Sequence, residues 1–253
     1  MSAQGAKKGS TMTQQNNGII EVIRKLLALT DSPVEGEAQA AAAKVQELLF
    51  KHNLALEEIG AVGEPVAGVS AIMHITFQDP SWGKSDGSWR SLLVGRVARF
   101  NFCRALYGSQ GQFWIIGTST NTAVVRELFL WITSQLKSIG NAAYKQYTER
   151  GGFDRKPTFL RGFYYGAAIS IGYRLEAQWK TLTEGSLVGT ALAVRTEAKL
   201  AEYVDSTFSA RKSPGGSASS ASGYKAGREA GATVNIIVPR GRLGDEKTSE
   251  LTG

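Results

Sequence analysis

The side chains of this chain that could do chemistry are mainly the arginines, lysines and tryptophans of its middle part. The chain has two histidines, His52 and His74, and a single cysteine, Cys103. These are too few for most zinc sites of proteins, and nothing in the sequence brings a histidine beside Cys103 or a serine, as a nucleophilic site requires. The P-loop and H-E-x-x-H motifs are also missing. We therefore predict no catalytic residue, metal site or cofactor from these motifs.

One acidic pattern leaves an enzymatic alternative open. Glu197 lies two residues before Lys199 and follows the run 190–194, which we expect to be a buried strand. An acidic residue and a lysine at a strand end can hold a divalent metal and polarise a phosphate. The nearest upstream acidic partner is Asp154. These residues would form a metal-dependent nuclease, although a solvated helix face is the simpler explanation.

Positive charge is concentrated in the middle of the chain. Residues 18–60 hold four lysines and arginines against seven acidic residues, whereas residues 87–180 hold thirteen against four, in a chain of net charge +7. A basic region of this kind favours a polyanionic partner. Contacts with phosphates would give binding that is sensitive to salt and largely independent of sequence. The candidate nucleic-acid-binding residues are Trp82, Arg96, Arg99, Arg104, Lys145, Arg150, Arg155, Lys156 and Arg161.

Helical spacing decides which of these residues can act together. Arg96 and Arg99 are three residues apart and share one side of a predicted helix, but Arg90 lies elsewhere around it. The segment 87–148 is therefore better interpreted as a scaffold. We expect the binding surface at its edges, which are the loop around Trp82, the turn 108–111 and the basic loop 150–156. Trp82 and Trp114 are the aromatic side chains that could stack on bases.

The elements that must position these residues predict an α+β fold. Apolar residues recur at helical spacing over 87–102, 120–148 and 159–181. A strand is expected at 71–77, and two strands flank the glycine-containing turn 108–111 as a β-hairpin. The fold class is an N-terminal helical hairpin followed by a small antiparallel sheet backed by long helices.

The last part of the chain has a different composition. After the strand expected at 190–194, Thr196 is expected to cap a short helix that ends near Val204. Residues 209–222 resemble a flexible Ser/Gly linker. Gly223, Gly227 and Gly231 then recur every four residues, which indicates either a short helix that packs closely or a backbone that approaches a ligand. A final strand over 233–238 and a frayed tail from 240 complete the prediction.

These patterns divide the chain into five parts and place it in a cell compartment. The parts are a leader at 1–17 with a possible alternative start at Met12, a helical hairpin at 18–60, an α+β domain at 61–208, the linker at 209–222 and a C-terminal segment at 223–253. The leader has no apolar core typical of a secretory signal. No run of about 18 apolar residues predicts a membrane span. With one cysteine, we expect a cytoplasmic protein with no membrane partner.

The helical hairpin carries a resemblance to a known family. The strings IRKLLALT, from Ile23, and AAAKVQELLFKHNL, which ends at Leu54, closely resemble the DUF2786 domain in order and spacing. Residues from about Trp89 to Phe208 resemble, more loosely, the domain that often follows it. This family of uncharacterised proteins is common in bacteriophages and bacteria. The resemblance implies a phage setting, and hence the host cytoplasm, but no mechanism.

Together these observations favour a non-enzymatic accessory protein that binds nucleic acid in phage DNA metabolism, with DNA favoured over RNA as the partner. Two alternatives remain. The hairpin at 18–60 could bind a protein partner such as a host factor, because its acidic balance argues against contact with phosphates. The metal-dependent nuclease built on Glu197 and Lys199 is the other.

Overall fold

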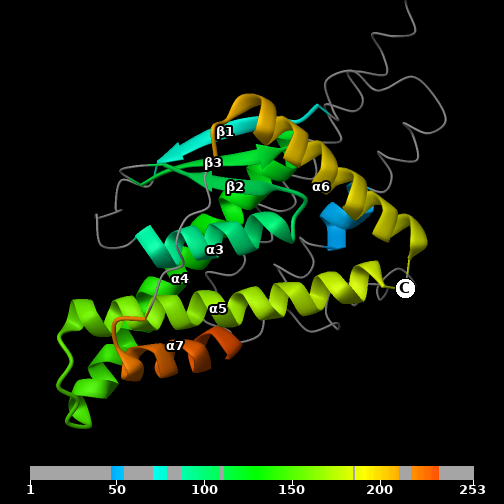
Figure 1. The fold of residues 1–253 in the computed structure, drawn as a ribbon. Helices are drawn as coiled ribbons and strands as arrows, with labels where there is room; N and C mark the ends of the chain where they lie inside the picture. The colour runs from blue at the N-terminus through cyan, green and yellow to red at the C-terminus, as the bar shows by residue number, and fades with distance from the viewer. Residues whose placement is uncertain are drawn as a thin grey trace, which may run out of the picture.

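The computed structural model describes residues 47–53, 71–78, 87–108, 111–184, 186–210 and 218–233. Long helices surround a small antiparallel sheet, which confirms the α+β class (Figure 1). Of the N-terminal hairpin, only the helical residues 47–53 lie within the described part. The final strand expected at 233–238 also lies outside it, apart from Thr233. The elements are β1 (Met73–Gln78), α3 (Gly87–Arg99), β2 (Arg104–Tyr107), β3 (Gln112–Gly117), α4 (Ser119–Glu149), α5 (Lys156–Thr183), α6 (Leu187–Thr207) and α7 (Ala221–Thr233).

The sheet has the strand order β1-β3-β2, and both pairings are antiparallel. The predicted hairpin is confirmed, because Tyr107 of β2 pairs with Phe113 of β3. Side chains alternate between the two faces of a strand. Phe113 and Ile115 accordingly enter the main core, while Ile116 joins a smaller cluster on the opposite face.

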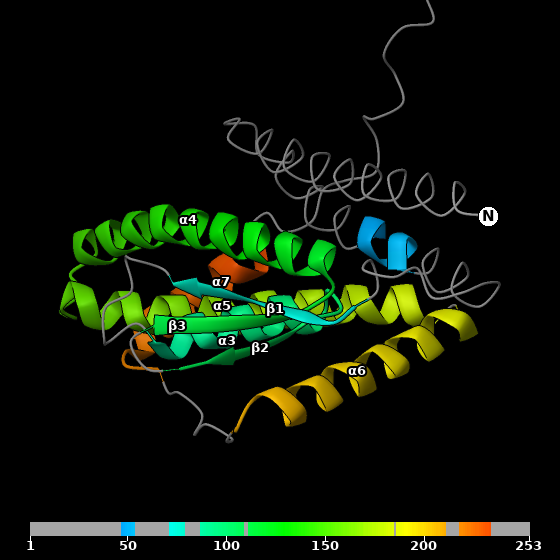
Figure 2. The same ribbon diagram turned by 90° about the horizontal axis from the view of Figure 1, so that it is seen from above.

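Helices lie on both faces of this sheet (Figures 1 and 2). On one face, α3, α4 and α5 form the main core, in which Leu93, Phe129 and Phe163 are fully buried. On the other face, α6 contributes Leu200 and Val204 to the smaller cluster. None of the helices in the described ranges is both long enough and apolar enough to cross a membrane.

The helix starts follow local capping chemistry. The Thr118 hydroxyl accepts a hydrogen bond from the Asn121 backbone N–H at the start of α4. Ser186 does the same for the Gly189 N–H at the start of α6. Pro157 lies in the first turn of α5, where its missing N–H costs nothing. Each of these bonds satisfies a backbone donor that a helix start would otherwise leave without a partner.

Two predictions in the C-terminal third are wrong. The run 190–194 is not a strand, and Thr196 does not cap a helix, because α6 runs unbroken from Leu187 to Thr207. The burial of Leu192, Leu200 and Val204 at intervals of eight and four residues is helical and explains the difference. So short an apolar run does not show whether its repeat is that of a strand or of a helix, so the sequence could not distinguish the two.

The junction between α3 and β2 is also tighter than expected. We expected the helix to extend to Phe102, but it ends at Arg99. The Asn101 side chain donates to the Val97 carbonyl, and Phe102 takes a positive φ of 56°. This conformation is costly for a residue with a Cβ. Phe102 is held there by burial between the rings of Phe50 and Trp179.

The helix α7 packs along α5 with the two backbones in close approach. Residue numbers rise together along both helices, since Gly223 meets Phe159, Gly227 meets Phe163 and Gly231 meets Ala167. The two helices are therefore parallel, and they lie side by side in Figure 1. The predicted short helix with a small face is confirmed, and its glycines contact α5.

Glycine is required at this contact because the two backbones leave no room for a Cβ atom. A Cβ built on Gly227 would overlap the backbone carbonyl of Phe163, and one on Gly162 would lie 2.6 Å from the Ser220 carbonyl oxygen. Polar contacts support the same register, because Ser170 donates to the Arg228 carbonyl at 2.8 Å. At the α5–α7 contact the two backbones thus lie directly against each other.

Candidate nucleic-acid interface

The chain reverses direction between α4 and α5 at residues 145–156, which we name the α4–α5 tip. Arg150 ends α4, and Gly151 takes a φ of 81°, which glycine adopts without strain. Figure 1 shows the tip at one end of the long helices, away from the sheet. The basic loop that the sequence predicted at 150–156 therefore joins two rigid helices.

Two tyrosines of α4 hold the backbone of the tip. The Asp154 N–H donates to the Tyr147 hydroxyl at 3.2 Å, and the Tyr144 hydroxyl donates to the Asp154 carbonyl at 3.3 Å. The Tyr147 ring stacks on Phe159 with centroids 4.7 Å apart. Gly152 lies directly against the Tyr147 ring, where a Cβ would overlap it. The loop is therefore fixed from the helix side by aromatic packing and hydrogen bonds.

The start of α7 is bonded to the same tip. The Ser220 hydroxyl donates to the Asp154 carboxylate and accepts from the Gly223 N–H at 2.9 Å, so it also caps α7. The Ser219 hydroxyl donates to the Thr158 carbonyl. Asp154 is thus committed to a structural contact. The start of α7 and the start of α5 lie together at this end of the molecule.

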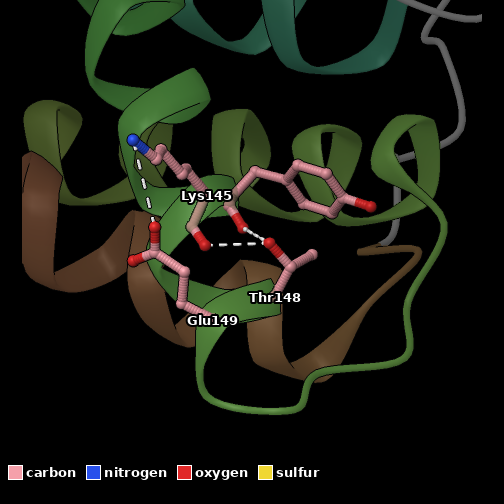
Figure 3. Close-up of polar contacts among 4 residues, drawn as sticks. Lys145, Thr148 and Glu149 are labelled. Carbon is pink, nitrogen blue, oxygen red and sulfur yellow. Dashed lines mark hydrogen bonds and ion pairs between the residues drawn. The ribbon is translucent and has the colours of Figure 1, made fainter.

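The basic side chains of the tip are exposed. Lys145, Arg150, Arg155 and Lys156 all face solvent. Lys145 Nζ lies 3.9 Å from a Glu149 carboxylate oxygen, as Figure 3 shows for the last turns of α4. This i,i+4 pair is exposed and contributes little to stability, so Lys145 can exchange it for another anion. The tip therefore presents several exposed cations.

The sequence analysis missed the most exposed aromatic residue of the part of the chain that the structure describes. Phe153 lies at the centre of the tip and is 97% exposed. Its neighbour Gly152 packs inward on Tyr147, while Phe153 extends away from the protein. The signal that could have found it is an aromatic residue between two glycines and the Asp-Arg-Lys run of a predicted loop. Phe153 is thus an exposed aromatic side chain beside the cations of the tip.

The structure separates the remaining candidates from the tip. Arg161 is half-buried one to two turns into α5. Arg96 lies against Gly172, which is about 24 Å along α5 from Lys156 at 1.5 Å per residue. Arg99 is exposed at the end of α3, and Arg104 begins β2. The described candidates thus divide into a group at the tip and a scattered group on α3, β2 and α5.

Trp114 and Arg90 are both engaged in packing. Trp82 lies outside the described residues. Trp114 is half-buried, and its ring packs on Phe208 with centroids 5.7 Å apart. Arg90 is buried with its guanidinium 4.8 Å from the centre of the Trp89 ring, so it cannot reach a phosphate. Both side chains belong to the packing of the fold.

A second group of exposed apolar side chains lies on α6. It consists of Leu187, Val188 and Val194. The charges around it have both signs, with Lys199 and Glu197 on the same helix. This surface offers no preference for a polyanion, which distinguishes it from the tip.

The nuclease alternative loses the strand on which it rested. Glu197 and Lys199 are exposed residues within α6, and Asp154 is bonded to Ser220. Among the described residues, no group of three histidine, cysteine or acidic side chains is placed to hold a metal ion. Burial raises the pKa of the Cys103 thiol well above its usual range, so at neutral pH the thiol stays protonated and is a poor nucleophile.

Comparison with known proteins places one segment in a family. Residues 18–56 match the model of DUF2786, a protein family of unknown function, which confirms the resemblance of the helical hairpin. Comparisons with curated proteins and with solved structures found no match.

The described end of the matched segment is built into the core. Leu49 is fully buried, and Phe50 packs against Phe102 and Trp179. The side-chain amides of Asn53 and Asn121 exchange two hydrogen bonds, both 3.1 Å long, in a buried setting. Asn53 is helical here and does not take the left-handed cap conformation that its position after the apolar run suggests. These side chains serve to fix the segment to α4 and α5.

Proposed function

We propose that this protein is a non-enzymatic nucleic-acid-binding protein whose α4–α5 tip contacts the phosphate backbone. The observation that carries the proposal is a fully exposed Phe153 set among Arg150, Arg155 and Lys156 on a loop held between two helices. Phosphate contacts position a nucleic acid without reading its sequence. The resemblance to a family common in phages supports a role in phage DNA metabolism, with DNA as the partner.

Charge and rigidity at the tip support a phosphate ligand. Arg150 and Arg155 each present planar donors that suit a phosphate oxygen pair. The loop that bears them is fixed by Tyr144 and Tyr147, so little conformational entropy is lost when a ligand binds. The one acidic side chain inside the loop, Asp154, is bonded to Ser220. The tip is therefore preorganised for an anion.

Charge reversal tests this proposal. We expect Arg150→Glu, Arg155→Glu and Lys156→Glu together to weaken binding to single-stranded DNA at least about tenfold at low salt. Loss of three phosphate contacts should also reduce the slope of log affinity against log salt by about 2. Fluorescence anisotropy over a salt series measures both quantities. The three side chains are exposed, so the thermal melt should remain as in the wild type.

A matched control removes the effect of net charge. Reversal of Lys180, Arg195 and Lys199, which are exposed on α5 and α6, changes the charge by the same amount far from the tip. We expect this variant to keep the wild-type salt slope. Equal losses in the two variants would contradict a site at the tip, and no binding by the wild type at low salt would refute nucleic-acid binding altogether.

A further inference from the structure

We infer that Phe153 stacks on an unpaired base, so that the tip selects single-stranded over duplex nucleic acid. This inference rests on the proposed function and adds the class of ligand. Phe153 is the only large apolar side chain exposed at the tip, within the described ranges. A phenyl ring that is 97% exposed packs very little on its own protein, so a partner that covers it would gain nearly all of its apolar burial.

The backbone of the loop fixes the ring in its outward position. On one side, Gly152 is pressed against the Tyr147 ring, and on the other, the Asp154 N–H and carbonyl are both bonded to tyrosine hydroxyls. Phe153 lies between these two anchors. The ring is thus presented outward on a held backbone, as a stacking surface requires.

Phe153 and the cations next to it suit the two parts of a nucleotide, the ring for the base and the cations for the phosphates. Arg150 is three residues before the ring, and Arg155 and Lys156 are two and three residues after it. A base on the ring would leave its flanking phosphates near these side chains. Aromatic stacking combined with a positively charged surface is the general mode of binding to single strands.

Duplex and membrane ligands fit less well. In a duplex both faces of a base are covered by its neighbours, so a ring at a loop tip reaches one only after a step is unstacked. An anionic membrane would favour several inserted apolar side chains. At the tip Phe153 is accompanied by Glu149 and Asp154 and by no second exposed large apolar residue among those described.

The test compares oligonucleotides with and without bases. The three ligands are an oligothymidylate, an abasic strand and a duplex, all of the same length. That length is about 20 nucleotides, which exceeds the site of a single binding module. We expect the wild type to bind the oligothymidylate about tenfold more tightly than the abasic strand, and more tightly than the duplex. Phe153→Ala and Phe153→Leu should reduce oligothymidylate binding to the abasic level.

Phe153→Trp is the matched control, because it keeps an aromatic face and should keep the preference for bases. Phe153→Leu keeps apolar surface and loses the ring. Salt-dependent binding that is equal for the base-bearing and abasic strands would overturn this inference and leave the proposed function standing. Tighter binding to the duplex than to the oligothymidylate would overturn it too. So would a result in which Phe153 is needed for binding to vesicles of anionic lipid but not for binding to any oligonucleotide. No binding to any strand would refute the proposed function itself.

Discussion

Two regions of α5 use small and large side chains in opposite ways. Along its α7-facing side, glycines let two backbones touch, and side chains are excluded because no space remains for a Cβ. At its N-terminal end, the tip presents a large aromatic ring and several cations to solvent. The first region holds the fold together. At the second, the described contacts of the exposed side chains are the solvent-exposed Lys145–Glu149 pair and the approach of Lys156 to the Tyr144 ring, which contribute little to stability.

This difference separates residues that stabilise the fold from residues that are available to bind a ligand. A substitution at the α5–α7 contact should change the free energy of unfolding. A substitution of an exposed side chain at the tip should change binding and leave stability nearly unaltered. Ser220 joins the two regions, because it caps α7 and bonds to Asp154 of the tip.

The largest loss of stability is expected for Gly227→Ala. Its new Cβ would overlap the Phe163 carbonyl, so either α7 must move away or both backbones must shift. We expect a loss of about 3 kcal/mol, at the upper end of the range for overpacked sites, measured by urea denaturation followed by circular dichroism. Gly95→Ala in α3 is the control, since nothing lies within 4 Å of its Cβ and alanine favours a helix. Similar stability of the two variants would contradict the close contact.

A smaller loss is expected where the DUF2786 segment meets α4. Asn121→Ala would remove the donor to the buried Asn53 side-chain oxygen, at a cost of about 1–3 kcal/mol, while the Asn53 side-chain N–H keeps its bond to the Leu49 carbonyl. The double variant with Asn53→Ala should lose less than the sum of the two single variants, because the amides depend on each other. Additive losses in a double-mutant cycle would show that the pair does not form.

The smallest effect is expected at the residue that joins the two regions. Ser220→Ala removes the α7 cap and the bond to Asp154, and should cost about 1 kcal/mol. Ser222→Ala, at an exposed position in the same helix, should be nearly neutral. Thermal denaturation compares the two. If the Ser220 variant were as stable as the Ser222 variant, the hydrogen bonds of Ser220 to α7 and to Asp154 would not contribute to stability.

Apolar periodicity predicted most of the described fold. It failed where a short apolar run fits both a buried strand and a buried helical turn. The long helices and the β2–β3 hairpin follow from apolar spacing and glycine in the turn. The short run 190–194 was predicted as a strand because it is too short to show a helical period. In the structure it lies within α6, which begins at Leu187 after the Ser186 cap. The glycine spacing at 223–231 predicted a packed helix, but only the fold shows that its partner is α5.

The candidate site was predicted in part. Charge identified the loop 150–156, because a cluster of cations between two helices is visible in the sequence. Burial could not be predicted for Arg90, whose stacking on Trp89 depends on the fold. Exposure could not be predicted for Phe153 either, since an aromatic residue in a loop normally folds back on its domain. Its exposure depends on the hydrogen bonds that Tyr144 and Tyr147 make with the Asp154 backbone, which only the fold shows.

The most direct test of the proposed interface is ultraviolet cross-linking of the wild-type protein to oligothymidylate, followed by trypsin digestion and mass spectrometry. Trypsin cleaves after Arg150 and Arg155 and releases residues 151–155 with Phe153 inside. The account predicts that nucleotide adducts concentrate on this peptide and disappear at high salt. Adducts confined to other peptides, or the same adducts on this peptide after Phe153→Ala, would contradict it.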